Sequence, residues 1–175
     1  MPPARLELIL EGAGWGRIEI TSGDSQHVIP GISYLSNALD DLLRVGIDVA
    51  TDRGYGLAQF FHEPGSTILV AETGWWEDGA WVRGARLSAF FGPEFGEGEP
   101  TWKMAHETPR AFVVDCGSRD ELARVFLDAA ISVRENHGED GYHKLWNGQL
   151  GYPRRAVAAL EAALALPSLE VEPWK

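Results

Sequence analysis

The chain has 175 residues, of which 45% are hydrophobic and 23% are charged, the balance of a folded globular protein. Its 15 Lys and Arg residues are outnumbered by 26 Asp and Glu residues, and the formal net charge of −11 argues against binding to nucleic acid or to anionic membranes. Cys116 is the only cysteine, so no internal disulfide can form. Because no apolar run is long enough to cross a bilayer, we expect a cytoplasmic protein.

The first elements predicted are a hairpin and a helix. Hydrophobic and polar residues alternate over 5–10 and 17–21 around a glycine-rich turn, which indicates two paired strands. A loop is expected through Pro30 and Gly31. The next segment carries leucine and isoleucine at helical spacing, with Ser33 or Ser36 as the N-cap. These apolar positions are Leu35, Leu39, Leu42, Leu43 and Ile47.

A strand over 57–61 precedes the strongest hairpin signal in the chain. Segments 67–76 and 81–91 flank Asp78-Gly79, a pair typical of two-residue type I′ turns. This turn predicts a register with Trp76 opposite Trp81, Val70 opposite Leu87 and Ile68 opposite Ala89. We expect that face of the hairpin to lie in the core, and Trp76 and Trp81 to be either core residues or a cross-strand stack.

The C-terminal part is predicted to be mainly helical. After a strand over 110–115, Ser118 and Glu121 form a capping box that starts a helix with a broad apolar face. We expect Phe126 on that face to be almost fully buried and Gly138 to end the helix. Pro153 is predicted to open a last helix that Pro167 stops, whereas residues 92–109 contain no element that the pattern assigns with certainty.

Because the strands come mostly in hairpins and the helices mostly at the end, the expected fold class is α+β. It would have a mainly antiparallel sheet of about five to six strands, with helices packed on one face. Residues 1–167 are expected to form a single domain and residues 168–175 a loose tail.

No motif in the chain specifies a catalytic mechanism. The histidines lack the spacing that would place two of them on one zinc ion, so no metal and no cofactor is expected. Cys116 precedes a helix N-terminus, where a helix dipole can lower a thiol pKa, but no flanking signature supplies a partner base.

The hairpin around Asp78 offers the best candidate binding surface. Tryptophan is enriched in protein interfaces, and Trp75 alternates to the face opposite Trp76. Trp75 and Val82 would form a partly exposed patch if helices cover only one side of the sheet. The alternative is that the loop from Gly92 to Pro100 covers the patch. The predicted binding residues are Trp75, Val82, Glu72, Glu77 and Asp78.

Three stretches together resemble a family of small actinobacterial α+β proteins without a stated activity. They are Ser33 to Leu39, Glu63-Pro64-Gly65, and His137 to Trp146 followed by Tyr152-Pro153. The resemblance implies a fold and no catalytic residue. By size, acidity and general build, the chain is also similar to immunity proteins of bacterial toxin systems, which are small acidic binding proteins.

These observations favour a non-enzymatic cytoplasmic protein, immunity-like, that binds a basic protein partner. Two alternatives stay open. One is an enzyme whose catalytic residues are dispersed in sequence, near Cys116 and His106. The other is a structural subunit that forms a homodimer through the Trp75 face.

Overall fold

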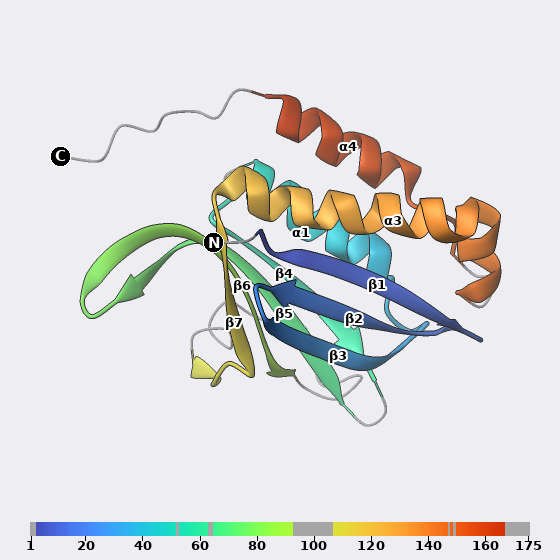
Figure 1. Ribbon diagram of the computed structural model, residues 1–175, viewed down its shortest axis with the longest axis horizontal. Coiled ribbons are helices and arrows are strands. Elements are labelled where there is room, and N and C mark those ends of the chain that lie inside the picture. Colours follow the sequence, from blue (N-terminus) through green and yellow to red (C-terminus); the bar gives the residue numbers. More distant parts are fainter. Residues whose placement is uncertain are drawn as a thin grey trace.

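The computed structural model describes residues 3–51, 53–62, 65–92, 107–146, 148 and 150–166. These residues form two antiparallel sheets and three helices (Figure 1). Most of 92–109, including His106, and the expected tail at 168–175 lie outside the described residues. In the part that is described, no helix has the length and apolarity needed to span a membrane.

The first sheet has the order β1-β2-β3, formed by Arg5–Gly12, Trp15–Ser22 and Ser25–Ser33. The predicted β1–β2 hairpin is confirmed, but the loop expected through Pro30 and Gly31 is wrong, because both residues belong to β3. They occupy a bulge between the pairs Gly16–Ile32 and Ile18–Ile29, with Gly31 at a φ of +61°. Proline is tolerated in β3 because this strand is at the edge of the sheet.

The second sheet has the order β4-β5-β6-β7, formed by Tyr55–Phe61, Ser66–Glu77, Ala80–Gly92 and Phe112–Gly117. Asp78 and Gly79 form the predicted two-residue turn with positive φ values of 49° and 80°, and Trp76 pairs with Trp81.

The register predicted further along this hairpin is wrong by one residue. An irregularity between Glu72 and Gly74 shifts the pairing, so that Val70 pairs with Ser88 and Ile68 with Phe90. A bulge of this kind cannot be counted from the turn, because it inserts a residue without any change in the alternating pattern around it.

Helix α1 spans Ala38–Ala50 and starts later than the predicted cap residues. Asn37 is its N-cap and makes no side-chain capping bond. The hydroxyl of Ser36, one of the two serines proposed as the cap, instead accepts a hydrogen bond from the Phe61 N–H at 2.7 Å. It therefore ties the start of α1 to the end of β4.

The other two helices follow the predictions more closely. Helix α3, Arg119–Leu145, begins with the predicted capping box, in which Ser118 and Glu121 each accept from the other's backbone N–H. Gly138 breaks the helical geometry with a φ of +66° and divides α3 into two helical segments, so the first segment ends there as predicted. Helix α4, Arg154–Ala165, starts after Pro153 as predicted.

One large hydrophobic core joins both sheets and all three helices. α1 packs against α3, α4 and β4, while α3 packs against β1, and Figure 1 shows α4 outermost. Phe126 of α3 is fully buried, as predicted. The α+β class is confirmed, but the strands form two sheets of three and four rather than one sheet of five to six. Both faces of β5 are buried from Ser66 to Glu72, so this sheet has no open face there.

Two of the three stretches that carry the family resemblance, Ser33 to Leu39 and His137 to Trp146 with Tyr152, meet in a single packing unit, whereas Glu63 and Pro64 of the third lie outside the described residues. The indole N–H of Trp146 donates to the Ser36 carbonyl at 3.2 Å, and the ring of Trp146 stacks on Tyr142. The hydroxyl of Tyr152 donates to the Ala130 carbonyl at 2.9 Å. All three aromatic side chains are buried. These motifs therefore hold the end of α3 against the start of α1, which is a structural role.

Candidate functional site in a projecting tryptophan hairpin

The end of the β5–β6 hairpin projects from the body because its neighbouring strands are too short to accompany it. β4 pairs with β5 only as far as Glu72, and β7 pairs with β6 only from Ala85 onward. Residues 74–83 therefore form a two-stranded ribbon that no described strand flanks, visible at the left of Figure 1. In Figure 1 it extends away from the three helices.

Trp76 and Trp81 lie on one face of this ribbon and are exposed. Their exposed fractions are 68% and 55%, so of the two arrangements expected for them the core placement is wrong and the cross-strand contact is observed. The two rings meet edge to face, with centroids 5.9 Å apart. The ring of Trp81 also lies directly over Gly74, where a Cβ atom would be only 2.4 Å from it. The pair is thus held in place by the ribbon itself.

Trp75 and Val82 are cross-strand neighbours on the opposite face and are half-buried. The Trp75 ring packs over Gly84 and under the guanidinium of Arg86, which lies 4.2 Å from the ring centroid. A cation over an indole ring is a favourable arrangement that also shields the ring from water. The predicted patch of Trp75 and Val82 therefore exists but is less open than the Trp76 face.

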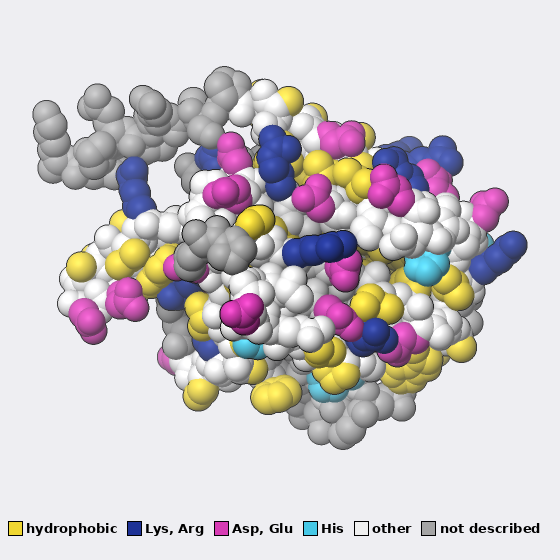
Figure 2. Space-filling model, in the orientation of Figure 1, with side chains coloured by type: hydrophobic (Ala, Val, Ile, Leu, Met, Phe, Trp, Pro, Cys, Tyr) yellow, Lys and Arg dark blue, Asp and Glu magenta, His cyan; other side chains and the backbone are white. Residues whose placement is uncertain are grey.

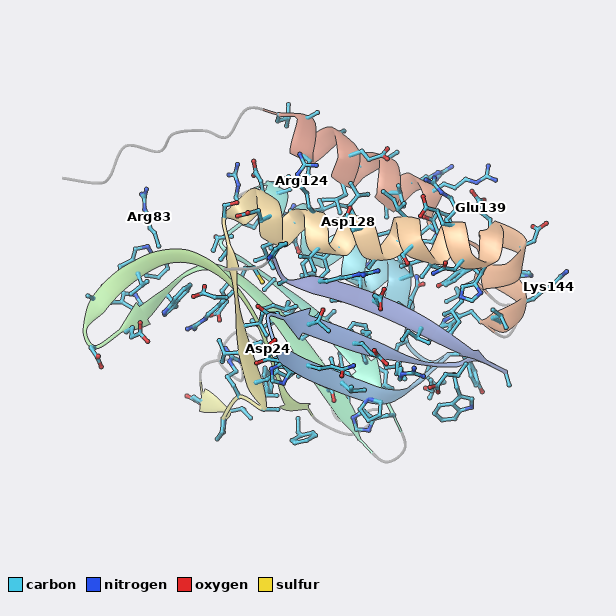
Figure 3. All side chains as sticks on the ribbon, in the orientation of Figure 1. Asp24, Arg83, Arg124, Asp128, Glu139 and Lys144 are labelled. Carbon is cyan, nitrogen blue, oxygen red and sulfur yellow. The ribbon has the colours of Figure 1, made fainter. Side chains whose placement is uncertain are left out.

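The tip of the ribbon is acidic and fully accessible. Glu77 and Asp78 are exposed there, next to the tryptophan pair. Arg83 is also exposed and points away from the body (Figure 3). The space-filling view shows hydrophobic side chains along the ribbon and acidic ones at its end (Figure 2). The ribbon thus combines an aromatic face with a charged rim.

Glu72 stands at the root of the ribbon and is completely buried, so it is not part of the acidic tip. Its Oε2 atom accepts a hydrogen bond from Arg86 Nε at 2.8 Å and lies 3.6 Å from Arg110 Nη2. The guanidinium of Arg110 in turn lies 5.3 Å from the centroid of the Phe90 ring. Sequence patterns did not single out either arginine, because the position of Arg86 depends on the register that the bulge determines and Arg110 lies in the segment before β7.

Several buried polar atoms around Glu72 have no hydrogen-bond partner. Among the described residues five such side-chain atoms occur, and four belong to this root: Glu72 Oε1, Trp75 Nε1, Ser88 Oγ and Arg110 Nη1. Leaving one buried donor or acceptor unpaired costs about 1–3 kcal/mol. Four of them together would cost an amount comparable with the stability of a typical domain. Within the described structure, this root is therefore the place where additional hydrogen-bond partners would stabilise the protein most.

The geometry around Cys116 gives little support to the alternative that the protein is an enzyme. The thiol is buried and donates weakly to the Val114 carbonyl, and burial raises the pKa of Cys116 to about 12. A thiol in this state is protonated at neutral pH and is a poor nucleophile. Its proposed companion His106 lies outside the described residues. Within the described ranges no group of three His, Cys, Asp or Glu side chains is placed to hold a metal ion.

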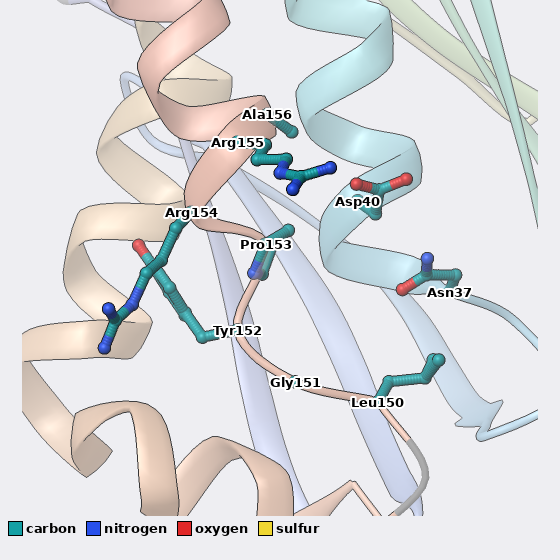
Figure 4. Close-up of a pocket in the computed structure, with 9 residues that line it drawn as sticks. All are labelled: Asn37, Asp40, Leu150, Gly151, Tyr152, Pro153, Arg154, Arg155 and Ala156. Carbon is teal, nitrogen blue, oxygen red and sulfur yellow. The ribbon is translucent and has the colours of Figure 1, made fainter.

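A surface pocket of about 370 Å³ lies between the start of α1 and the segment that leads into α4 (Figure 4). Two of its three charged side chains are already engaged elsewhere. Asp40 pairs with Arg44 at 2.8 Å, and Arg154 pairs with Glu139. None of the four unpaired atoms at the ribbon root lines it. The pocket therefore offers less specific chemistry than the hairpin.

Comparison with known proteins gives no independent assignment of this site. No family model, no curated protein and no solved structure matches the chain.

Proposed function

We propose that the protein is a cytoplasmic binding protein that recognises a basic protein partner through the projecting ribbon. The observation that carries this proposal is the exposure of Trp76 and Trp81 as a preorganised pair on a ribbon that no described strand flanks. Folded monomers avoid exposed aromatic surface, and tryptophan is among the residues that most often anchor protein interfaces. The ribbon presents these anchors without a rearrangement of the core.

The charge distribution favours a basic partner. Glu77 and Asp78 border the tryptophan face, and the chain as a whole carries a net charge of −11. Such a surface speeds encounter with a cationic protein and repels a second copy of itself. Arg83 would then pair with an acidic residue at the edge of the contact, where charges contribute to orientation more than to affinity.

The experiment is an affinity capture from the native host with three forms of the protein. They are the natural protein, the double variant Trp76→Ala/Trp81→Ala, and Phe91→Ala as a matched control. Phe91 is 73% exposed and belongs to the same strand pair, but it lies outside the ribbon. A captured protein is then purified, and its affinity for each form is measured by calorimetry over a series of salt concentrations.

We expect the captured protein to be basic and the double variant to bind at least about 30-fold more weakly, equivalent to about 2 kcal/mol. Phe91→Ala should bind like the natural protein. Glu77→Lys should mainly slow association, and the more so at low salt. Unchanged affinity in the double variant would contradict the proposal. Sedimentation that shows a dimer, lost in the double variant, would assign the ribbon to self-association instead.

A further inference from the structure

The root of the ribbon contains a buried polar cluster that the proposed protein contact does not use. Glu72, Arg86 and Arg110 come from β5, β6 and the segment before β7, and Ser88 follows Arg86 on the same face of β6. Glu72 and Ser88 are fully buried, while the side chains of Arg86 and Arg110 retain exposed fractions of 20% and 16%. The carboxylate and the hydroxyl are therefore shielded from solvent, and the two arginine side chains are the partly exposed members of the cluster.

Counted over Glu72, Arg86 and Arg110, the cluster has one positive charge more than it has negative charge; Asp115, which pairs with Arg86 across the strands, is exposed. Two guanidinium groups share one carboxylate, and both ion pairs involve the same oxygen, Oε2 of Glu72. Burial is the main cause that lowers the pKa of Arg110, and the charge of Arg86 acts in the same direction. Water can satisfy an unpaired hydrogen-bonding group, but it cannot neutralise a desolvated cation. The cluster would be stabilised by an anion.

The unpaired atoms also determine which hydrogen-bond donors and acceptors such an anion must have. Arg110 Nη1 and Trp75 Nε1 are donors and require acceptor oxygens. The ionised carboxylate of Glu72 can only accept, so its unpaired Oε1 requires a donor from the ligand. The hydroxyl of Ser88 can serve in either role. A ligand that consists only of acceptors would place one of its oxygens against Glu72 and be repelled.

We propose that this root cluster binds a small oxyanion that carries at least one O–H donor, such as hydrogen phosphate or a hydroxy carboxylate. The acceptor oxygens lie against Arg110 and the indole N–H of Trp75, and the O–H donates to Glu72 Oε1. This site is separate from the Trp76–Trp81 face, so the proposal does not depend on the protein partner.

The test is an NMR titration of the ¹⁵N-labelled protein in which the indole N–H of Trp75 is observed. A spectrum of Trp75→Phe identifies that resonance, because the variant lacks it. Inorganic phosphate and lactate are added in separate titrations, and sulfate and chloride serve as controls. Sulfate has the charge and the acceptors of a phosphate dianion but no O–H at neutral pH. It therefore isolates the role of Glu72.

We expect a saturable shift of the Trp75 indole resonance with phosphate or with lactate, and none with sulfate or chloride. In Glu72→Gln the side-chain amide can donate, so sulfate should then shift the resonance as well. An equal response of the natural protein to sulfate and phosphate would overturn the proposal. So would the absence of any saturable shift, which is the result expected if water alone fills the cluster.

Ser88→Ala provides a second test that does not depend on the behaviour of the Glu72 variant. Without ligand, removal of the unpaired hydroxyl should leave the unfolding temperature unchanged or raise it. With phosphate or lactate, the variant should bind about fivefold to tenfold more weakly than the natural protein. Val113→Ala is the matched control, because Val113 pairs with Ser88 across the sheet but is 53% exposed and carries no polar side-chain atom. Equal affinity of Ser88→Ala and the natural protein would contradict the placement of the ligand.

Discussion

Asp41 shows how the position of a single side chain in the first turn of α1 decides its protonation. It is half-buried beside the core, and burial is the main reason that the pKa of Asp41 rises to about 6. The neighbouring charge of Asp40 raises it further, and Arg44 lowers it. Because the pKa is higher in the folded protein than in the unfolded chain, the ionised carboxylate destabilises the fold. This penalty is absent below about pH 4 and complete above about pH 6.

Asp41→Asn should therefore stabilise the protein at pH 7. Allowing for solvent screening of a partly exposed group, we expect a gain of about 1–2 kcal/mol. The gain should shrink as the pH falls from 6 to 4 and then disappear. Denaturant titrations across this pH range measure it. The control is Asp40→Asn, which removes an ion pair with the exposed Arg44 and should cost about 0.5 kcal/mol at pH 7.

The thiol of Cys116 should be almost unreactive in the folded protein. It is 5% exposed, and its pKa of about 12 leaves very little thiolate at neutral pH. We expect iodoacetamide to alkylate Cys116 much more slowly in the native protein than in guanidinium chloride, with a rate limited by unfolding. Rapid alkylation under native conditions would show an accessible thiolate and would support the enzyme hypothesis.

At the scale of whole elements, the packing of the three helices depends on their close approach at Gly46. Gly46 of α1 leaves room for its neighbours, because a Cβ atom there would lie 2.8 Å from Leu160 Cδ2 and 3.0 Å from Phe126 Cβ. In sequence this glycine is only a weak point in a helix, where alanine would be preferred. The structure gives the reason for it, which is that α1, α3 and α4 meet at this position.

Gly46→Ala should consequently destabilise the protein, although alanine is the better helix former. The propensity gain of about 1 kcal/mol is opposed by overpacking, which typically costs about 1–3 kcal/mol, and by displacement of the fully buried Phe126. We expect a net loss of about 1–2 kcal/mol in denaturant unfolding. Arg44→Ala on the exposed side of the same helix should change stability by less than about 0.5 kcal/mol. A stabilised Gly46→Ala variant would show that the three helices can move apart at no cost.

Local chemistry explains which elements could be predicted and which could not. The turn at Asp78-Gly79 and the cap at Ser118 each depend on a few adjacent residues, and both are confirmed. β3 was missed because Pro30-Gly31, which is typical of a loop, also fits a bulge at a sheet edge. Trp76 and Trp81 were misplaced because their burial depends on the lengths of β4 and β7, strands distant in sequence.

At the scale of the molecule, the division of the strands into two sheets could not be predicted from sequence patterns. Alternation in β1 and in β4 indicates one buried face for each, but it does not indicate which strands pair. For the same reason, only part of the candidate site could be predicted from the sequence. Glu77 and Asp78 follow from the turn, whereas the contact of Glu72 with Arg86 and Arg110 requires three segments to be in place.

The hydrogen bond between Ser36 and Trp146 also constrains the order in which the protein can be completed during synthesis. The two residues are 110 positions apart in the chain. At a translation rate of about 5–20 residues per second, the Ser36 carbonyl is made about 5–20 s before the indole that will bond to it. β1, β2 and α1 therefore emerge from the ribosome well before the residues that close over them. A nascent chain stalled before Trp146 should remain sensitive to protease across its N-terminal sheet, and one that includes α4 should become resistant.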